Sequence, residues 1–260
     1  MLANYRKERE AFEQLLQGEA YRVLLLCGGS GMGKTTLLRT FERIAHEKPV
    51  YYVTPDFKDT IVLEDIFYLI GDFLEWENLP NLTGCISALH QPETLNVNVS
   101  SNWLIGIKQH LHVVLKTESA KERQERWQQL TDSLSKDLKK LSKPLLILFD
   151  TYERADSEIQ EWITKSLLAR IRLFPQVRIV IAGQQVPEEN SVGYGNHTQL
   201  LKLEGVRGSK IGWNIQESKQ RKAGNLDETE FLQPICDSFH GHPQLIARLI
   251  EGLSTTGECA

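Results

Sequence analysis

The chain has 260 residues, of which 41% are hydrophobic and 25% charged, a composition that excludes a disordered tail, a collagen-like repeat and a coiled coil. Thirty basic and thirty-four acidic side chains give a net charge of −4, so no overall basic field draws the chain to nucleic acid or to an anionic membrane. Its four cysteines lie far apart and form no C-x-x-C pair, which argues against a zinc or redox motif.

Short apolar runs alternate with longer segments of helical period, which is typical of a parallel sheet covered by helices. The first ten residues lack the apolar core of a signal peptide, and no apolar run approaches the roughly 20 residues that span a bilayer. We therefore expect a cytoplasmic α/β protein with no membrane partner and a central, mostly parallel five-stranded sheet flanked by helices. The predicted strands are Tyr21–Cys27, Val50–Thr54, Leu145–Phe149, Val177–Ala182 and Gln199–Leu203.

Apolar residues at helical spacing predict three helices between these strands. Their stripes run from Leu37 to Ile44, from Trp127 to Leu141 and from Ile159 to Ile171. The stretch from Asn78 to Asn102 keeps no period and is predicted to be irregular, and the type of Trp103–Leu115 is left open. We expect a solvated basic face on the second stripe, with Asp132 and Asp137 opposite Lys136, Lys139, Lys140 and Lys143.

The composition changes again after about Gly205, where glycines and the basic run Lys219–Lys222 indicate a linker. Two further helical stripes follow, separated by Gly241-His242-Pro243. We therefore predict two units: a nucleotide-binding core over residues 1–205 and a small helical lid over residues 206–260.

The strongest chemical signal is the segment Gly28–Thr35, which fits G-x-x-x-x-G-K-[ST] at every specified position. A predicted strand precedes it and a predicted helix follows it, which is the context that this phosphate-binding loop (Walker A) requires. Backbone N–H groups of such a loop converge on phosphate oxygens, and the helix N-terminus adds its positive dipole. We expect Lys34 to contact the β- and γ-phosphates and Thr35 to bind Mg²⁺. The expected contacts of ATP or ADP are Gly28, Gly29, Ser30, Gly31, Met32, Gly33, Lys34, Thr35 and Thr36.

A second Mg²⁺ ligand is expected at the end of another buried strand. Leu145–Phe149 ends in Asp150, which places a carboxylate at the carboxyl edge of the sheet, where ligands of open α/β sheets bind (Walker B). Many P-loop ATPases carry a catalytic acid directly after this aspartate, but here Thr151 stands in that place. Glu153 is the candidate general base, and the alternative is an acid that merely flanks the next helix.

The fourth predicted strand ends at Ala182, and Gln184 follows it. If this strand lies between the two motif strands, Gln184 is a candidate sensor of the γ-phosphate. The alternative is a loop glutamine that faces solvent. Lys34, Glu153 and Gln184 are thus the candidate catalytic residues.

With phosphate loop, Mg²⁺ strand and sensor strand in this order, the chain resembles the AAA+-related P-loop ATPases, and within them the STAND class, which includes NB-ARC and NACHT proteins. The segment Asn4–Glu8 resembles the h-h-G-R-E element of that class, which implies that Arg6 lies beside the adenine. Gly241-His242-Pro243 resembles its G-x-P element, which implies that Pro243 packs on the adenine from the lid. An ordinary helix–helix turn is the alternative for these three residues.

Three departures from the class accompany the resemblance. Gln184 stands where many STAND proteins have an arginine, and Thr151 replaces the second acid. The chain also ends at Ala260, soon after the lid helix. We expect it to be either the nucleotide-binding core of a longer protein or a minimal relative.

These observations favour a slowly hydrolysing signal-transduction ATPase that acts as a conformational or assembly switch, with ATP and a protein partner, or its own copies, as partners. One alternative is a nucleotide-binding interaction module that hardly hydrolyses ATP. Another is an AAA+-type motor or loader that handles DNA, which the negative net charge disfavours. A P-loop kinase is a further alternative, although the sequence shows no arginine-rich lid or acceptor-binding motif. His110, His112, Arg170 and Arg172 are expected to be core or surface residues.

Overall fold

Five short segments form the strands of one sheet in the computed structural model, which describes residues 2–3, 5–59, 61–89, 101–116, 119–205, 213–214, 234, 237–246 and 248. All five strands run parallel, in the order β3–β4–β5–β2–β6. The predicted α/β fold with a parallel five-stranded sheet is confirmed. The strands are β2 (Val23–Cys27), β3 (Tyr51–Val53), β4 (Leu145–Phe149), β5 (Val177–Gly183) and β6 (Thr198–Lys202).

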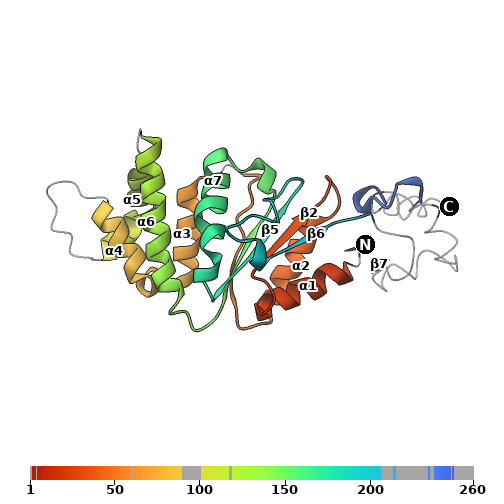
Figure 1. Cartoon of the computed structure of the whole chain (residues 1–260), viewed down its shortest axis with the longest axis horizontal. Coiled ribbons are helices and arrows are strands. Elements are labelled where there is room, and N and C mark those ends of the chain that lie inside the picture. The colour runs from red at the N-terminus through yellow and green to blue at the C-terminus, as the bar shows by residue number, and fades with distance from the viewer. Residues whose placement is uncertain are drawn as a thin grey trace, which may run out of the picture.

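The two faces of the sheet bury alternate residues of each strand, as the period of two dictates. Leu24, Leu148 and Val180 face one core with α1 (Arg6–Gln17) and α2 (Lys34–His46), where the rings of Phe12 and Phe41 stack at 4.0 Å. Figure 1 shows α1 and α2 together on one side of the strands, and α3 to α7 on the other.

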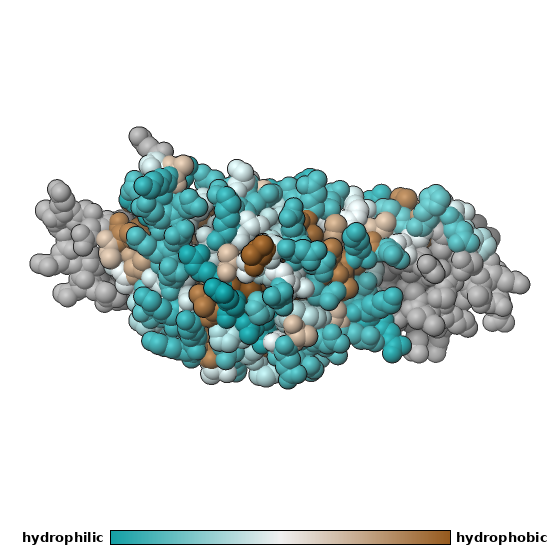
Figure 2. Space-filling model, in the orientation of Figure 1, coloured by the Kyte–Doolittle hydropathy of each residue, from teal (hydrophilic) through white to brown (hydrophobic). Residues whose placement is uncertain are grey.

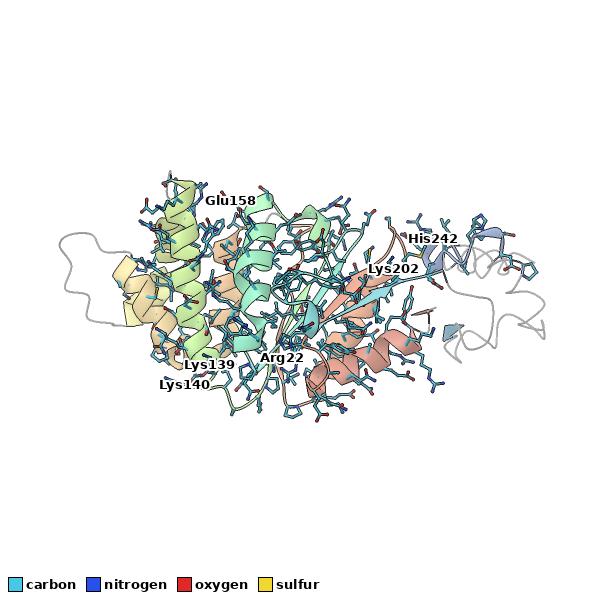
Figure 3. All side chains as sticks on the ribbon, viewed as in Figure 1. Arg22, Lys139, Lys140, Glu158, Lys202 and His242 are labelled. Atoms are coloured by element: carbon cyan, nitrogen blue, oxygen red, sulfur yellow. The ribbon has the colours of Figure 1, made fainter. Side chains whose placement is uncertain are left out.

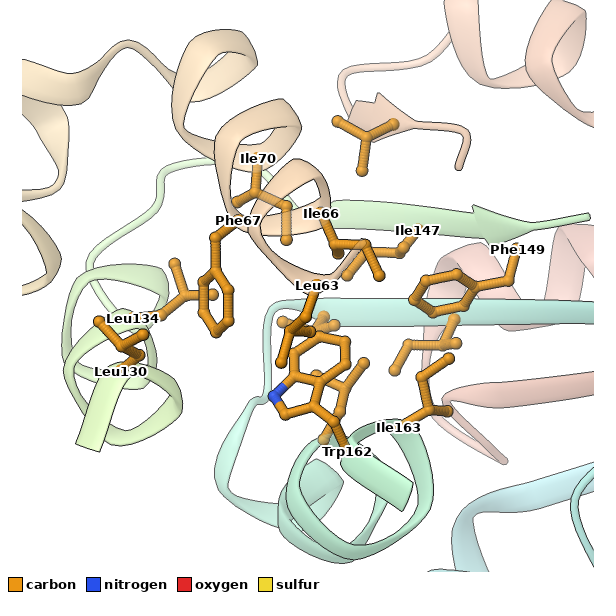
Figure 4. Packing of buried hydrophobic residues seen from close by; sticks show 14 of the residues in the cluster. Leu63, Ile66, Phe67, Ile70, Leu130, Leu134, Ile147, Phe149, Trp162 and Ile163 are labelled. Carbon is orange, nitrogen blue, oxygen red and sulfur yellow. The ribbon is translucent and has the colours of Figure 1, made fainter. Parts of the chain in front are cut away.

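The second core is larger and extends well beyond the sheet. Its helices are α3 (Leu63–Leu74), α4 (Pro80–Leu89), α5 (Ser101–Leu115), α6 (Ala120–Leu138) and α7 (Ser157–Glu161), which continues as a π-helical turn over Trp162–Leu167 and a 3₁₀ turn over Leu168–Leu173. Trp162 is fully buried in this core, with its ring 5.5 Å from the Phe67 ring (Figure 4). Its indole N–H donates to Thr131 Oγ1 at 3.0 Å.

The prediction of an irregular segment from Asn78 to Asn102 is wrong where the structure describes it. Helix α4 occupies residues 80–89, and α5 begins at Ser101; residues 90–100 lie outside the described part. Pro80 is tolerated because the first helical residue needs no N–H donor. The next amide groups are satisfied by Asp137, whose carboxylate accepts from Asn81 N at 3.2 Å and Leu82 N at 2.8 Å.

The expectation that Asp137 lies on a solvated face is therefore wrong. Asp137 is 1% exposed and lies between α6 and α4. Lys139 and Lys140, by contrast, lie on the surface at the end of α6 (Figure 3). The end of α6 therefore carries a buried aspartate that caps α4, followed by exposed lysines on the surface.

The chain beyond β6 is described in part. A short antiparallel pair joins β1 (Leu2–Ala3) to β7 (Trp213–Asn214), and residues 237–246 lie beyond the carboxyl end of β6. The predicted linker Lys219–Lys222 and most of the two lid stripes fall outside the described residues, so the boundary at 205/206 stays a prediction. Among the described helices, none is long and apolar enough to cross a membrane, and the face in Figure 2 is mainly hydrophilic with scattered apolar residues.

Candidate nucleotide-binding site

The phosphate loop starts where β2 ends, at the carboxyl edge of the sheet. Its first residue is fixed to the neighbouring strand, because Gly28 N donates to Gly183 O at 3.1 Å. At the other end Gly33 adopts a φ of 79°, a left-handed conformation that side chains disfavour, directly before α2 begins at Lys34. The loop therefore delivers the N-terminus of a 13-residue helix to the edge of the sheet.

Lys34 curls back over this loop. Its ammonium donates to Gly28 O at 2.6 Å and Gly29 O at 2.9 Å. Burial lowers the pKa of Lys34 from its ordinary value, and the carboxylates of Glu153 and Asp150 partly offset that effect. A phosphate bound at the loop would supply the further negative charge that a partly desolvated ammonium favours.

Asp150 ends β4 with a side chain only 5% exposed. The loop after β3 holds its backbone on both sides, since Asp150 N donates to Pro55 O at 3.0 Å and Phe57 N donates to Asp150 O at 3.1 Å. Phe57 is itself buried and stacks on Phe149 at 5.8 Å. The loop after β3 is thus a fixed wall of the site.

This wall contributes two site residues that sequence reasoning missed, Asp56 and Lys58. Asp56 Oδ1 accepts from Lys58 N at 3.0 Å and from Thr151 Oγ1 at 3.2 Å. The Lys58 ammonium lies 3.1 Å from Thr35 Oγ1 and 3.8 Å from both Asp150 Oδ2 and Asp56 Oδ2. In the sequence, Pro55-Asp56 after a predicted strand looks like an ordinary turn. These residues could have been found only from the expectation that this turn lies at the same edge of the sheet as Asp150.

These oxygens fit a Mg²⁺ ion in chemistry and in number. Thr35, Asp150 and Asp56 already surround one cation, the Lys58 ammonium, and hydroxyl and carboxylate oxygens are the donors that Mg²⁺ prefers. Within the described residues no group of three or more His, Cys, Asp or Glu side chains has a metal-binding arrangement. Mg²⁺ commonly binds through one or two carboxylates together with the phosphates of its substrate, which is what this site offers.

Glu153 lies close to the phosphate loop because of an unusual turn. Thr151 has a φ of 59°, and the 3₁₀ turn Tyr152–Arg154 follows it. Glu153 Oε2 consequently accepts from Gln184 N at 2.9 Å, just beyond β5. The structure therefore brings Glu153 to the edge where Lys34 and Asp150 lie.

Gln184 itself lies between the two motif strands, because β5 pairs with both β2 and β4. Both backbone groups of Gln184 form hydrogen bonds: its N–H donates to Glu153 Oε2, and its carbonyl accepts from Cys27 Sγ at 3.3 Å. Its side chain is exposed at the sheet edge. A role as γ-phosphate sensor stays a prediction.

The N-terminal element differs from what the resemblance implied. Tyr5, which replaces the glycine of that element, is the residue that meets the phosphate loop, and its hydroxyl donates to Met32 O. Burial raises the pKa of Tyr5, with Glu8 adding to the effect. Arg6 is instead 72% exposed and pairs with Glu10 at 2.8 Å, so the structure does not bring it to the loop.

The Gly241–Pro243 element, near the C-terminus of the chain, contacts the phosphate loop. The His242 ring donates from Nε2 to Ser30 O at 2.8 Å, and Pro243 is buried beside it. Figure 3 places His242 beyond the end of β6, past Lys202. The packing is close, because a Cβ atom at Gly31 would overlap the His242 ring.

The remaining candidates lie away from this edge. His112 Nδ1 is 3.1 Å from Glu64 Oε1 between α5 and α3, and Arg170 pairs with Asp132 at 3.0 Å. Both contacts join helices on the α3–α7 side of the sheet, away from the phosphate loop.

A strand, a phosphate loop and a helix, with a buried aspartate on a nearby parallel strand, define a P-loop nucleotide-binding domain. The sequence pattern of the AAA ATPase domain matches residues 6–181, and the chain belongs to this family. A comparison with curated proteins gives no match.

Two similar solved structures are Cdc6p from Pyrobaculum aerophilum and the Aeropyrum pernix Orc1 protein in complex with DNA. For Cdc6p the TM-score is 0.53 at 14% identity over 98% of this chain; for Orc1 it is 0.46 at 17% over 99%. The chain spans 62% and 60% of the lengths of those two proteins. At this identity the likeness to Cdc6p shows the fold alone, and membership of the STAND class stays a prediction.

Proposed function

We propose that the chain is an ATPase that binds ATP with Mg²⁺, hydrolyses it slowly and acts as a nucleotide-dependent conformational switch. One observation carries the proposal: the C-terminal segment touches the phosphate loop through the His242–Ser30 hydrogen bond. A ligand shifts a conformational equilibrium only if it contacts the two states differently. Phosphates held by this loop would do so, because they bind the same few residues that His242 contacts.

The geometry of the site supports the following proposed roles. Loop amides and Lys34 would bind the phosphates, while Thr35 and Asp150 would hold Mg²⁺, which would neutralise negative charge on the phosphates. Glu153 accepts a proton from the attacking water, and Gln184 orients the phosphate or the water. Because Thr151 occupies the usual place of the acid, we expect turnover well below the ~10 s⁻¹ typical of enzymes.

The switch is tested by limited proteolysis of the full chain with ADP and with a non-hydrolysable ATP analogue. Protection of the segment after Gly205 should differ between the two nucleotides in the parent protein. H242A should lose that difference but still bind nucleotide, and K34A should show no nucleotide effect. Equal protection in ADP and the analogue contradicts the switch.

Hydrolysis is tested separately by phosphate release in single-turnover and steady-state conditions, with K34A as the control. Slow release above the K34A background supports the ATPase. Release equal to that background would instead favour a binding module that holds nucleotide without turnover. Solution mass measured with each nucleotide tests self-association as the output of the switch.

A second candidate is an ATPase that handles DNA, which the AAA ATPase fold shared with Cdc6p allows as well as a signalling ATPase. The net charge of −4 argues against a broad electrostatic contact with DNA. Duplex DNA binding measured from low to high salt decides the matter, because contacts to phosphates give a steep linear fall of log affinity with log salt. Absence of binding at low salt removes this candidate.

A further inference from the structure

Lys58 occupies an unexpected place in the candidate site. Its ammonium donates to Thr35 Oγ1 at 3.1 Å and lies 3.8 Å from Asp150 Oδ2, the two side chains that the motifs assign to Mg²⁺. A third oxygen, Asp56 Oδ2, also lies 3.8 Å away. The lysine cation thus sits among the oxygens that a metal ion would use.

This placement is built into the backbone. The carboxylate of Asp56 accepts from the Lys58 N–H and from the Thr151 hydroxyl, which fixes the turn that carries the lysine. The backbone of Asp150 is hydrogen-bonded to Pro55 and Phe57 on the same loop. Metal ligand and lysine are therefore parts of one rigid unit, and the lysine stem is what can move.

Two cations cannot share these oxygens at close range. Mg²⁺ binds oxygen at about 2.0–2.1 Å and, being divalent, strongly repels an ammonium in the same cluster. The Lys58 side chain is 47% exposed and has a flexible four-carbon stem, so it can swing into water without disturbing the fold. Lys34 cannot take its place, because it is held by the carbonyls of Gly28 and Gly29.

We propose that Lys58 is an internal competitor of Mg²⁺, which neutralises Asp150 and Asp56 and must be displaced before the metal binds. The biological meaning of this competition rests on the proposed nucleotide-binding function. Nucleotide would then occupy the site together with Mg²⁺ only above a threshold concentration of free Mg²⁺.

The test uses Mn²⁺ alone as the probe, titrated into the full chain without nucleotide and followed by electron paramagnetic resonance. K58M should bind Mn²⁺ about fivefold to twentyfold more tightly than the parent, since one or two opposite charges about 4 Å away are freed. K58R, which keeps the cation, should remain near the parent. K58M combined with D150N should lose the gain.

K108M is the matched control, because Lys108 also pairs with an aspartate, Asp65, at 2.7 Å but lies away from the site. It should leave Mn²⁺ affinity unchanged. A K58M affinity equal to the parent, no measurable Mn²⁺ binding by K58M, or an equal gain in K108M overturns the proposal. A chain that shows the expected Mn²⁺ pattern but no ATP binding refutes the proposed function alone.

Discussion

Thr151 is held in a backbone conformation that a β-branched residue normally avoids. Its φ of 59° puts it in the left-handed region, where such residues are rare outliers that cost about 1–3 kcal/mol. Its hydroxyl donates to Asp56, which ties the turn to the loop after β3. The turn brings Glu153 back to the sheet edge from two residues further along the chain.

We expect E153Q to lower the steady-state rate of phosphate release by about 10²-fold, since a positioned general base typically contributes 10²–10⁴-fold. ATP affinity should stay the same, because glutamine keeps an acceptor for Gln184 N and the loop amides are untouched. E161Q, which alters an exposed acid paired with Lys165, is the control. An E153Q rate equal to that of the parent would make Glu153 a structural residue.

D150N should weaken ATP binding in the presence of Mg²⁺ more than it weakens ADP binding in its absence. The amide removes a charged oxygen that a hard cation prefers, while the phosphate loop keeps its own contacts. Calorimetric titration with and without Mg²⁺ measures both. Equal losses under the two conditions would show that Asp150 acts on the fold of the site rather than on the metal.

How far the site can be read from the sequence depends on how local its signals are. The phosphate loop is a continuous string, and Asp150 directly ends an apolar strand, so both are recognisable in isolation. Asp56 and Lys58 are not, because they reach the site only through the pairing of β3 with β4, a contact between segments about 90 residues apart. Tyr5 was missed for another reason: the resemblance drew attention to its neighbour Arg6.

At the scale of single helices, two glycines should respond in opposite ways to the same substitution. Gly71 in α3 lies beneath the Trp76 ring, so the Cβ of G71A would overlap that ring and cost about 1–3 kcal/mol of unfolding free energy. Gly84 in α4 has nothing within 4 Å, so G84A should gain up to about 1 kcal/mol from helix propensity. Urea unfolding of both variants measures the difference. A stabilised G71A would contradict the packing.

Helix α4 should also depend on a side chain from another helix. D137A removes the acceptor for Asn81 N, Asn81 Nδ2 and Leu82 N, and we expect a loss of about 2–3 kcal/mol in chemical unfolding. D132A, whose carboxylate forms a surface pair with Arg170, should cost less than about 1 kcal/mol. Similar losses in the two variants would deny the capping role.

This cap explains why α4 escaped prediction while the strands did not. The central strands β2, β4 and β5 are recognisable as largely apolar runs, because they are buried on both faces. Helix α4 has a proline at its start and several polar residues, and its orphan N–H groups find their acceptor 55 residues further along the chain. No local pattern records such a partner.

For the molecule as a whole, binding of nucleotide should raise the stability of the fold. The site joins the ends of β2, β3, β4 and β5, so a ligand held there binds the folded state alone. At a concentration 100 times its Kd, ATP with Mg²⁺ should add about 2.7 kcal/mol, or roughly 5–10 °C in Tm for a chain of this size. K34A should show no such shift in thermal unfolding. A parent protein without a shift would contradict nucleotide binding.

The order of the strands has a consequence for synthesis on the ribosome. Strands β2 and β4 are not neighbours, because β5 lies between them and pairs with both. About 150 residues separate the end of β2 from the start of β5, so at 5–20 residues per second the nascent chain carries β2 without its central partner for roughly 8–30 s. During that interval the apolar residues Val23–Leu26 lack both of their partner strands, β5 and β6, and this stretch of the nascent chain is where chaperone binding or aggregation is expected to begin.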